Sequence, residues 1–423
     1  MIKFFIETYG CALNTSDSEK MAGILEENGF IQTFNIEDSN VIILNSCTVK
    51  TPTENKIYKR LREIEKLKIP IILAGCLAQT EVDIEKLKNY SLIGTHQIDN
   101  IVEIVEEAIH NSKITLIAEG SINRLELKSK SKSDLISIIP ICHGCLGDCS
   151  YCKVKFARGK LKSFSEEQIL LNVQNAINDG FKEIWLTAQD VGAYGLDINT
   201  NLPSLLNKIL NLEGSFKIRL GMGNPNHIIK FLPELIECFT NKKLFSFLHI
   251  PLQSANNQVL KRMNRKYNVD DFKKIVNDFR ERIRNITIAT DIICGFPEES
   301  KEQFDDTLNL IKDLKIEIVN ISRFWPRSGT KASKLKGYNG SIAKKRSGEL
   351  SKLYVPQAFE ENKKWIGWKG NIFINEVGKF NSLIGRNQSY RQVIINSSSE
   401  LLGKIVSVRV FDVSSYDLRA KRI

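Results

Sequence analysis

Three cysteines near the middle of the chain have the spacing of an iron–sulfur site. Cys145, Cys149 and Cys152 lie in the string GCLGDCSYC with the spacing C-x3-C-x2-C. Three thiolates can hold three irons of a 4Fe-4S cubane and leave the fourth iron open, whereas electron-transfer clusters usually take four cysteines. An open iron is what a substrate or cofactor needs in order to coordinate directly. The spacing therefore favours a cubane that binds a further ligand.

Zinc is the alternative metal for this run of cysteines. Zinc sites prefer C-x2-C pairs repeated at a distance, and a single triple beside a strand fits that pattern poorly. Cys142 extends the run and is a conceivable fourth ligand, but it lies two residues before Gly144, so we assign it to the end of a strand. Cys238 and Cys294 have apolar neighbours in sequence and are expected to be structural.

A second set of cysteines is spread along the first part of the chain. Cys11, Cys47 and Cys76 each follow a predicted strand, in ETYGC, LNSC and LAGC. A lone buried cysteine is more often a core residue than a ligand. Three at equivalent positions would converge at the carboxyl ends of parallel strands, where open α/β sheets bind ligands. Four polar residues flank these cysteines: Asn14, Asn45, Thr48 and Gln79. They either orient the cysteine loops by hydrogen bonds or are simply polar turn residues.

The elements that must position the second set alternate between strand and helix. Strands are expected at 3–10, 41–46, 70–75 and 91–95, with helices at about 18–28, 54–67, 81–89 and 98–110. This alternation indicates a parallel sheet with right-handed crossovers. Residues 121–134, rich in Lys and Ser, are interpreted as a linker.

From residue 135 the alternation continues in longer units. Strands are expected at 135–141, 182–188, 216–222, 244–250, 286–294 and 316–324, with helices between them. One helix should start at Ser165, where S-x-x-Q forms a capping-box pattern, and stop at Gly180; another should start near Pro203. Six strands predict an open partial barrel, because eight would need more chain. The central cysteines follow its first strand at the carboxyl end, where such sites gather.

The stretch 361–423 has short alternating strands separated by Gly, Asn and Ser turns, which predicts a small all-β barrel of oligonucleotide-binding type. Basic and aromatic residues are mixed here and at the end of the central barrel, and such mixtures can stack bases and contact phosphates. Trp325, Trp365 and Trp368 belong to this mixture, although Trp365 could equally be a core residue. The candidate RNA contacts are Arg323, Arg327, Lys363, Lys364, Arg386, Tyr390 and Arg391.

Composition bounds the class of protein. In 423 residues, the 42% hydrophobic and 26% charged fractions exclude wholesale disorder. No apolar run reaches the roughly 18 residues of a membrane span, and Glu7 interrupts any signal-peptide core. Nine cysteines, an odd number, favour reduced thiols and a cytoplasmic location over a disulfide framework.

The net charge of +11 suggests an anionic partner. Nucleic acid is the first candidate and a membrane surface the second, and the alternative is a basic surface that binds no partner. The charge is uneven: residues 1–128 carry −5, residues 129–360 carry +10 and residues 361–423 carry +6. We therefore expect RNA to be held by the second and third segments.

The central motif resembles that of the radical S-adenosylmethionine enzymes, in which the open iron binds the amino and carboxylate groups of S-adenosylmethionine. The resemblance narrows to their methylthiotransferase branch through Arg158 and Gly159 in CSYCKVKFARG, and through LTAQDVGAYG, FLHIPLQS, TDIICGFPEE and GRNQSYRQV. It covers essentially the whole chain. It implies an N-terminal methylthiotransferase domain at 1–128, a radical S-adenosylmethionine core of TIM-like partial (β/α)6 form at 133–360, and a tRNA-binding TRAM domain at 361–423.

The resemblance also implies roles for individual residues. Cys145, Cys149 and Cys152 would be the catalytic cluster ligands, and Cys11, Cys47 and Cys76 would hold an auxiliary 4Fe-4S cluster whose open iron carries the sulfur to be transferred. Gly295 would let the adenine approach the backbone closely. The alternative for Asp190 is an exposed acid in a turn. The alternative for Arg219 is an ion pair inside the barrel. The residues implied to contact S-adenosylmethionine line one rim: Gln189, Asp190, Arg219, His249, Gln253, Asp291 and Gly295.

The activity implied is methylthiolation of carbon 2 of a modified adenosine in a tRNA anticodon loop, driven by a 5′-deoxyadenosyl radical and an external low-potential donor of flavodoxin or ferredoxin type. KVKFARG lacks the proline of isopentenyladenosine-type enzymes, and the chain looks most like the archaeal and eukaryotic branch acting on N6-threonylcarbamoyladenosine. The eukaryotic members carry a C-terminal membrane anchor, and this chain stops at Ile423 without one, so we expect a cytoplasmic protein with no membrane partner. We also expect a monomer. The alternatives are the same chemistry on N6-isopentenyladenosine or on a ribosomal-protein aspartate, and a non-catalytic iron–sulfur RNA-binding protein.

Overall fold

The computed structural model describes residues 1–48, 50–81, 84–120, 122–397 and 399–423. The N-terminal part is a six-stranded, all-parallel sheet with the order β2-β1-β3-β4-β5-β6. Its strands are β1 (Lys3–Thr8), β2 (Ile31–Gln32), β3 (Val41–Ser46), β4 (Ile71–Gly75), β5 (Ser91–Ile93) and β6 (Thr115–Leu116). The predicted parallel sheet is confirmed.

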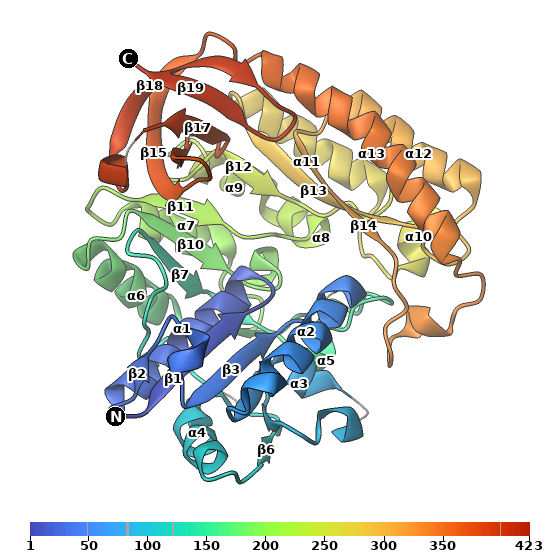
Figure 1. Ribbon diagram of the computed structural model, residues 1–423. Helices are drawn as coiled ribbons and strands as arrows, with labels where there is room; N and C mark the ends of the chain where they lie inside the picture. Colours follow the sequence, from blue (N-terminus) through green and yellow to red (C-terminus); the bar gives the residue numbers. More distant parts are fainter. Residues whose placement is uncertain (49, 82–83, 121, 398) are drawn as a thin grey trace.

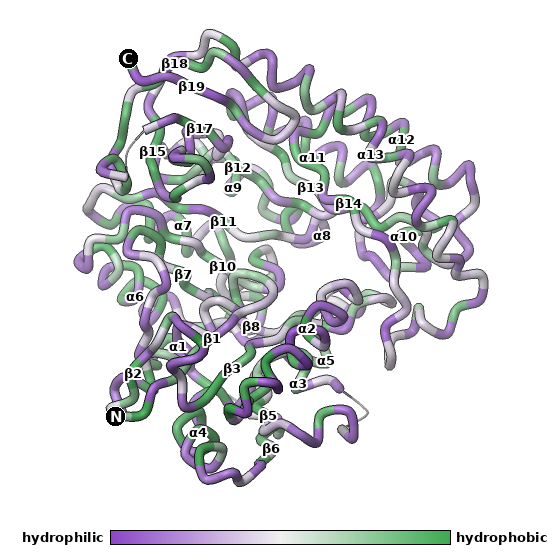
Figure 2. Tube along the Cα trace, viewed as in Figure 1, coloured by the Kyte–Doolittle hydropathy of each residue, from purple (hydrophilic) through white to green (hydrophobic). Residues whose placement is uncertain are grey.

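Helices cover both faces of this sheet. Helices α1 (Ala12–Glu27) and α4 (Ile101–Ile109) share one apolar core with the sheet, and α2 (Thr51–Ile64) and α3 (Cys76–Thr80) share the other. Because β3 is buried on both sides, its residues form a continuous run of buried positions instead of alternating with polar ones. Figure 2 shows hydrophobic residues gathered in these strands.

Two predicted helices differ from the structure. The first helix begins at Ala12, well before residue 18, and its early turns bury polar residues such as Asn14 and Asp17. That polar face has no apolar period for a sequence pattern to detect. The helix expected at 81–89 is described only as a short 3-10 turn at Ile84–Leu87, because α3 ends at Thr80 and Glu81 is extended; residues 82–83 lie outside the described part.

The predicted partial barrel is confirmed as two three-stranded parallel sheets, β11-β10-β7 and β12-β13-β14, joined by a bridge between Ile218 and Leu244. The strands are β7 (Ile136–Pro140), β10 (Glu183–Thr187), β11 (Lys217–Leu220), β12 (Phe247–His249), β13 (Thr287–Cys294) and β14 (Ile318–Arg323). A short ribbon of β8 (Cys142–His143) and β9 (Lys162–Ser163) follows the first strand.

Helices pack outside this barrel (Figure 1). They are α6 (Glu166–Asn178), α7 (Leu202–Leu210), α8 (Pro225–Ile228), α9 (Leu232–Cys238), α10 (Asn257–Arg262), α11 (Val269–Arg282), α12 (Lys301–Leu314) and α13 (Gly340–Lys363). The short helix α5 (Val154–Arg158) packs instead against α3 of the N-terminal part. Ser165 caps α6 by accepting from the Gln168 N–H, while the Gln168 side chain donates to Glu126 in the linker.

The C-terminal part is a closed five-stranded barrel with the order β15-β16-β17-β19-β18, as predicted. Its strands are β15 (Lys369–Val377), β16 (Ser382–Arg386), β17 (Gln392–Asn396), β18 (Ile405–Val413) and β19 (Leu418–Arg422). It docks on the central barrel through Tyr390, which packs against Phe245 and Phe247. Within the described residues, no helix combines the length and apolar character needed to cross a bilayer.

Candidate functional site

The three N-terminal cysteines meet at one edge of the sheet. Cys11, Cys47 and Cys76 follow β1, β3 and β4, which are adjacent strands. Cys47 and Cys76 are buried, and Cys11 is exposed. Because parallel strands end at the same edge, residues 65 positions apart in sequence form one N-terminal triad.

Two glycines allow the ligand loops to pack this closely. Gly10 has φ +122°, and a Cβ there would lie 2.9 Å from the Cys47 Cβ. Gly75 has φ +89°, and a Cβ there would lie 2.2 Å from Asn45 Oδ1. Side chains are excluded at both positions by neighbours that belong to the other ligand loops.

Asn14 fastens the loops together. Its Nδ2 donates to the carbonyls of Tyr9 and Ser46, at 2.9 Å each, just before Cys11 and Cys47. Its Oδ1 lies 3.6 Å from the Cys76 Sγ and 3.9 Å from the Cys11 Sγ. Of the flanking polar residues, Asn14 thus orients the loops directly.

The other three flanking residues act at different points. Asn45 supports Asn14 by donating to its carbonyl at 2.8 Å, and Thr48 bonds Glu54. Gln79 instead donates to the Ile117 carbonyl, toward the edge of the sheet. The sequence alone left these roles open.

A buried charge network joins this triad to the central barrel. Arg158 Nη2 donates to Asn14 Oδ1 at 2.6 Å, and its Nη1 donates to Asp17 Oδ2 at 2.5 Å. Arg124 Nε donates to Asp17 Oδ1 at 2.9 Å. The side chains of Asp17, Arg124 and Arg158 are each 1% exposed. Burial alone would raise the pKa of Asp17, but attraction to Arg158 and Arg124 holds that pKa below its ordinary value.

The central cysteines form a second triad in the loop after β8. The Gly147 N–H donates to Cys145 Sγ at 3.2 Å, and a Cβ at Gly147 would lie 3.2 Å from that sulfur and 3.6 Å from Cys149 Sγ. All three thiols are partly buried. Burial raises the pKa of Cys145 to about 11 and that of Cys152 to about 12.

Arg265 is the cation of this second triad, and sequence reasoning missed it. Its Nη1 donates to Cys149 Sγ at 3.1 Å, and its Nη2 bonds Asn224 Oδ1. Asn224 in turn donates to Asp190 Oδ2 at 2.6 Å. Arg265 lies more than a hundred residues beyond the motif, so no local spacing signals it.

Asp190 and Gln189 sit at the end of β10, as predicted, but with different surroundings. Asp190 is fully engaged: it accepts from the Gly192 and Asn224 backbones and lies 2.8 Å from His227 Nδ1. Its environment is therefore that of a loop-holding group with no free oxygen for a ligand. Among the described residues, the buried Oε1 atoms of Gln189 and Gln253 have no hydrogen-bond partner.

Three further rim candidates have defined contacts. His249 Nε2 lies 2.7 Å from Asp291 Oδ2. Arg219, expected to meet the cofactor carboxylate, has its guanidinium 4.8 Å from the Trp185 ring and 5.5 Å from the Phe247 ring. These aromatic neighbours hold it at the contact with the C-terminal barrel, and among the described residues it forms no ion pair.

The positive φ of Gly295 serves protein packing. A Cβ on Gly295 would lie 2.6 Å from Ala343, so the missing side chain lets helix α13 approach the backbone here. Cys142, Cys238 and Cys294 are buried, as expected for structural residues.

Three candidate RNA contacts are buried inside the protein. Arg327 bonds Glu54 and Thr48 of the N-terminal part. Tyr390 donates to Glu183 at 2.8 Å, and Arg391 is 8% exposed. Domain contacts occupy Arg327 and Tyr390, and the burial of all three side chains leaves no surface to offer a phosphate or a base.

The remaining candidates have partners at or near the surface. Lys363 and Lys364 are exposed but pair with Glu360 and Glu361. Arg323 donates to Ser347 at 3.0 Å, and the Arg386 guanidinium lies 4.9 Å from the Tyr390 ring.

The outer wall of the C-terminal barrel carries a basic row that sequence reasoning missed. Lys369 pairs in register with Arg409, and Arg409 pairs with Lys421, so the three exposed side chains lie side by side across β15, β18 and β19. Phe411 is 52% exposed, and Lys421 Nζ lies 5.2 Å from its ring. The alternation of exposed and buried residues along β18 could have placed Arg409 on the outer wall of the barrel.

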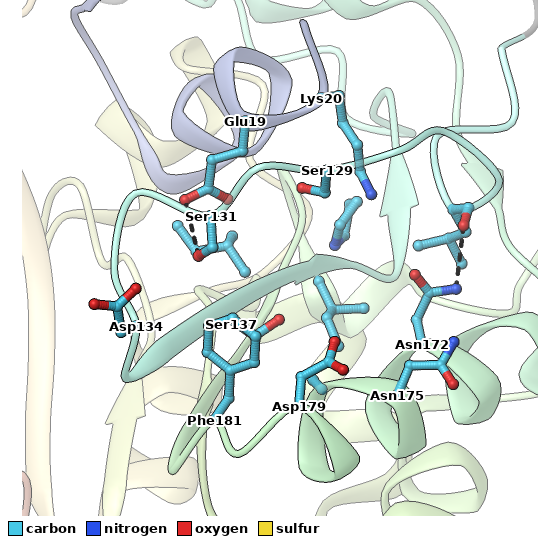
Figure 3. A pocket seen from close by; sticks show the side chains of 15 residues that line it. Glu19, Lys20, Ser129, Ser131, Asp134, Ser137, Asn172, Asn175, Asp179 and Phe181 are labelled. Atoms are coloured by element: carbon cyan, nitrogen blue, oxygen red, sulfur yellow. Dashed lines mark hydrogen bonds between the residues drawn. The ribbon is translucent and has the colours of Figure 1, made fainter. Parts of the chain in front are cut away.

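A cavity of about 400 Å³ opens between α1, the linker, β7 and α6 (Figure 3). Its walls are polar, with Glu19, Lys20, Asn172 and Asp179 pointing into it, and none of the six triad cysteines lines it. The cysteine triads therefore lie outside this cavity.

The two triads are brought together by a short helix. α5 follows Cys152 by one residue, ends at Arg158 and packs against α3, the helix that begins with Cys76. Five residues of helix rise about 7 Å, so the contact between α5 and α3 forms a short seam that links the loop of the central triad to the helix that begins with Cys76. In the described part of the chain no three His, Cys, Asp or Glu side chains converge to hold a single ion, whereas a cubane takes each thiolate on a different iron.

Three family models match the chain: Uncharacterized protein family UPF0004 over residues 3–93, the Radical SAM superfamily over 139–311, and the TRAM domain over 369–423. Among solved structures, the radical S-adenosylmethionine methyltransferase TsrM from Kitasatospora setae shares the fold with a TM-score of 0.55, at 13% identity over 76% of this chain and 73% of that one.

Whole-chain relatives are closer. A probable threonylcarbamoyladenosine tRNA methylthiotransferase of Pyrococcus abyssi is 40% identical over 398 residues, covering 93% of this chain and 94% of that protein. The threonylcarbamoyladenosine tRNA methylthiotransferase of Homo sapiens is 38% identical over 432 residues, covering 100% of this chain and 74% of that protein.

Proposed function

The chain belongs to the threonylcarbamoyladenosine tRNA methylthiotransferases, and from that membership we propose how its own residues divide the work. The reaction is radical methylthiolation of carbon 2 of N6-threonylcarbamoyladenosine in tRNA. The observation that carries the division is the pair of cysteine triads on either side of α5. One triad serves radical generation and the other serves sulfur delivery.

The central triad fits a 4Fe-4S cluster and S-adenosylmethionine. Cys145, Cys149 and Cys152 supply three thiolates, which leaves one iron for the cofactor. A cluster held by these thiolates would supply, when reduced, the electron for the cleavage of S-adenosylmethionine to methionine and a 5′-deoxyadenosyl radical. The unpartnered Oε1 atoms of Gln189 and Gln253 are suited to accept hydrogen bonds from the amino or hydroxyl groups of the cofactor.

Positioning of the central triad rests on a chain of polar contacts. Asp190 orients Asn224, Asn224 orients Arg265, and Arg265 donates to Cys149. His249 and Asp291 hold each other at the rim of the fourth and fifth strands. Through these contacts Asp190 contributes to the site without touching the cofactor.

The N-terminal triad fits a second 4Fe-4S cluster. Three thiols end adjacent strands, and Gly10 and Gly75 clear the space that their loops need. Asn14 fixes the loops, and Arg158 supplies a cation. Cys11, Cys47 and Cys76 would hold that cluster, which would supply the sulfur for methylthiolation.

The proposed tRNA surface lies on the C-terminal barrel and the central barrel. The row of Lys369, Arg409 and Lys421 beside Phe411 offers phosphate contacts and a stacking surface. These two segments hold the positive charge, while residues 1–128 carry −5. The target adenosine must leave its stack to reach the seam, which costs least in a single-stranded anticodon loop.

The electron donor in this proposal is an external low-potential protein of flavodoxin or ferredoxin type, and the enzyme acts as a cytoplasmic monomer. The isopentenyladenosine and ribosomal-protein alternatives are less favoured, because the cited relatives carry the threonylcarbamoyladenosine name.

The test is anaerobic reconstitution with iron and sulfide, followed by reaction with matched tRNAs carrying either modified adenosine. Mass spectrometry of the nucleosides should show 2-methylthio-N6-threonylcarbamoyladenosine and, in the isopentenyl tRNA, an unchanged base. Product on the isopentenyl tRNA alone would overturn the substrate assignment. A Cys149→Ala protein treated in parallel controls for sulfur added without radical chemistry.

A further inference from the structure

The trio of Asp17, Arg124 and Arg158 carries an unbalanced charge. Two guanidiniums share one carboxylate, so the trio has a net charge of +1 while each side chain is 1% exposed. In the described residues no second carboxylate forms an ion pair with either arginine. Leaving a buried charge uncompensated is costly, so an anion is expected beside the trio.

The position of Arg158 identifies that anion. Its guanidinium bonds Asn14 Oδ1, which lies within 3.9 Å of the sulfurs of Cys76 and Cys11. The Arg158 guanidinium and the Cys76 Sγ thus approach the same amide oxygen of Asn14. Arg124 reaches in the other direction, to the Thr95 carbonyl. The excess positive charge therefore faces the N-terminal triad through Arg158.

The asymmetry between the two arginines has a chemical meaning. An iron–sulfur cluster held by thiolates is anionic and gains one more negative charge when it is reduced. Hydrogen bonds to cluster sulfurs and nearby charges set the reduction potential of such a cluster. A buried cation close to the ligand sulfurs stabilises the reduced state and raises that potential.

We propose that Arg158 is a positioning residue that supplies the charge compensating the auxiliary cluster, with Asp17 as the counterion that sets how much of this charge the cluster receives. The inference rests on the proposed second cluster and goes beyond it by assigning residues that control its redox state. Arg158 belongs to α5, so the segment that begins beside Cys152 also sets the electrostatics of the N-terminal triad.

The test is a potentiometric titration of the full chain in a Cys149→Ala background, which removes a ligand of the central cluster and isolates the auxiliary one. Replacing Arg158 by Met should shift the measured midpoint potential to a more negative value, and Arg158→Lys should restore part of it. Asp17→Asn should shift the potential in the opposite direction, because it frees positive charge beside the cluster. Arg124→Met is the matched control: it removes the other partner of Asp17 and should shift the potential less than Arg158→Met.

A merely structural role predicts a different pattern. If the trio only fastened the domains, the Arg158→Met and Asp17→Asn proteins would lose stability and cluster together, with no opposite shifts in potential. Equal potentials in Arg158→Met and its parent, or an equal shift in Arg124→Met, would overturn the inference while leaving the second cluster in place. A parent protein with no auxiliary cluster by iron and sulfide content would overturn the proposed function as well. If Arg158→Met fails to fold, the Arg158→Lys and Asp17→Asn pair still gives the sign of the effect.

Discussion

The two cysteine triads bring three thiols together in different ways. The central triad comes from one loop of eight residues, and the N-terminal triad comes from three loops joined by sheet topology. Each triad has one arginine near its ligand sulfurs: Arg265 donates to Cys149 Sγ, and Arg158 donates to Asn14 Oδ1, which lies 3.6 Å from Cys76 Sγ. The cations differ in their partners: Arg158 pairs with Asp17, while Arg265 bonds the neutral Asn224. A neutral partner leaves the full charge at the central triad, and an ion pair moderates it at the other.

The largest effect should come from removing one ligand of each triad. Cys149→Ala should abolish 5′-deoxyadenosine formation, because the open-iron site is lost. Cys47→Ala should leave that cleavage intact and stop thiolation of tRNA. Both are read by chromatography of 5′-deoxyadenosine and mass spectrometry of nucleosides. Cleavage by Cys149→Ala, or normal product from Cys47→Ala, would break the division between the triads.

The cation of the central triad gives the next largest effect. Arg265→Met removes a charged donor 3.1 Å from Cys149 Sγ, and a lost charge-assisted hydrogen bond of about 1.5–3 kcal/mol corresponds to roughly a 10- to 100-fold slower cleavage of S-adenosylmethionine. Arg265→Lys should recover part of the rate. The control is Arg262→Met on the same segment, whose guanidinium bonds Glu298 and Gln303 away from the cysteines. Equal losses in both variants would mean that Arg265 has no special relation to the triad.

The tRNA surface gives a smaller effect and tests the charge asymmetry of the chain. Neutralising two of the row, Arg409→Gln with Lys421→Gln, should weaken tRNA binding about 10-fold and reduce the salt dependence by roughly two phosphate contacts. Filter binding across a salt series measures both quantities. Arg419→Gln is the control, because Arg419 is exposed but already paired with Asp412 and Asp417. Unchanged affinity in the double variant would place the tRNA elsewhere.

The smallest effect concerns Lys20, a residue of α1 whose side chain points into the cavity of Figure 3. Burial lowers the pKa of Lys20 to about 8, against roughly 10.4 in an unfolded chain. Above pH 8 the unfolded state binds more protons than the folded state, so stability rises with pH through that window. From pH 8 to pH 9 the contribution of Lys20 to the free energy of unfolding, taken as the difference from Lys20→Met in urea denaturation, should rise by about 1 kcal/mol. Lys20→Met should abolish this rise, and the exposed Lys132→Met should preserve it.

The sequence predicted the layout of the fold, because strand and helix periods are strong in the parallel sheet, the partial barrel and the terminal barrel. It also placed the central triad, since its ligands are neighbours in sequence. It missed Arg265 and the row of Lys369, Arg409 and Lys421, because both arise from register between distant strands or loops. It also assigned Arg327 and Tyr390 to RNA, because basic and aromatic residues at domain contacts have the same composition as those on a nucleic-acid surface.

The linker has a consequence for how this chain can be recombined. Arg124 lies within the polar stretch 121–134, and the Lys130 and Lys132 backbones donate to Glu19 of α1. A chimera that exchanged residues 1–128 with another protein would therefore carry Asp17 and Arg124 together and leave Arg158 facing a foreign partner. Because Asp17 pairs with both arginines, an exchanged segment must extend through α5 to keep Arg124 and Arg158 with this carboxylate.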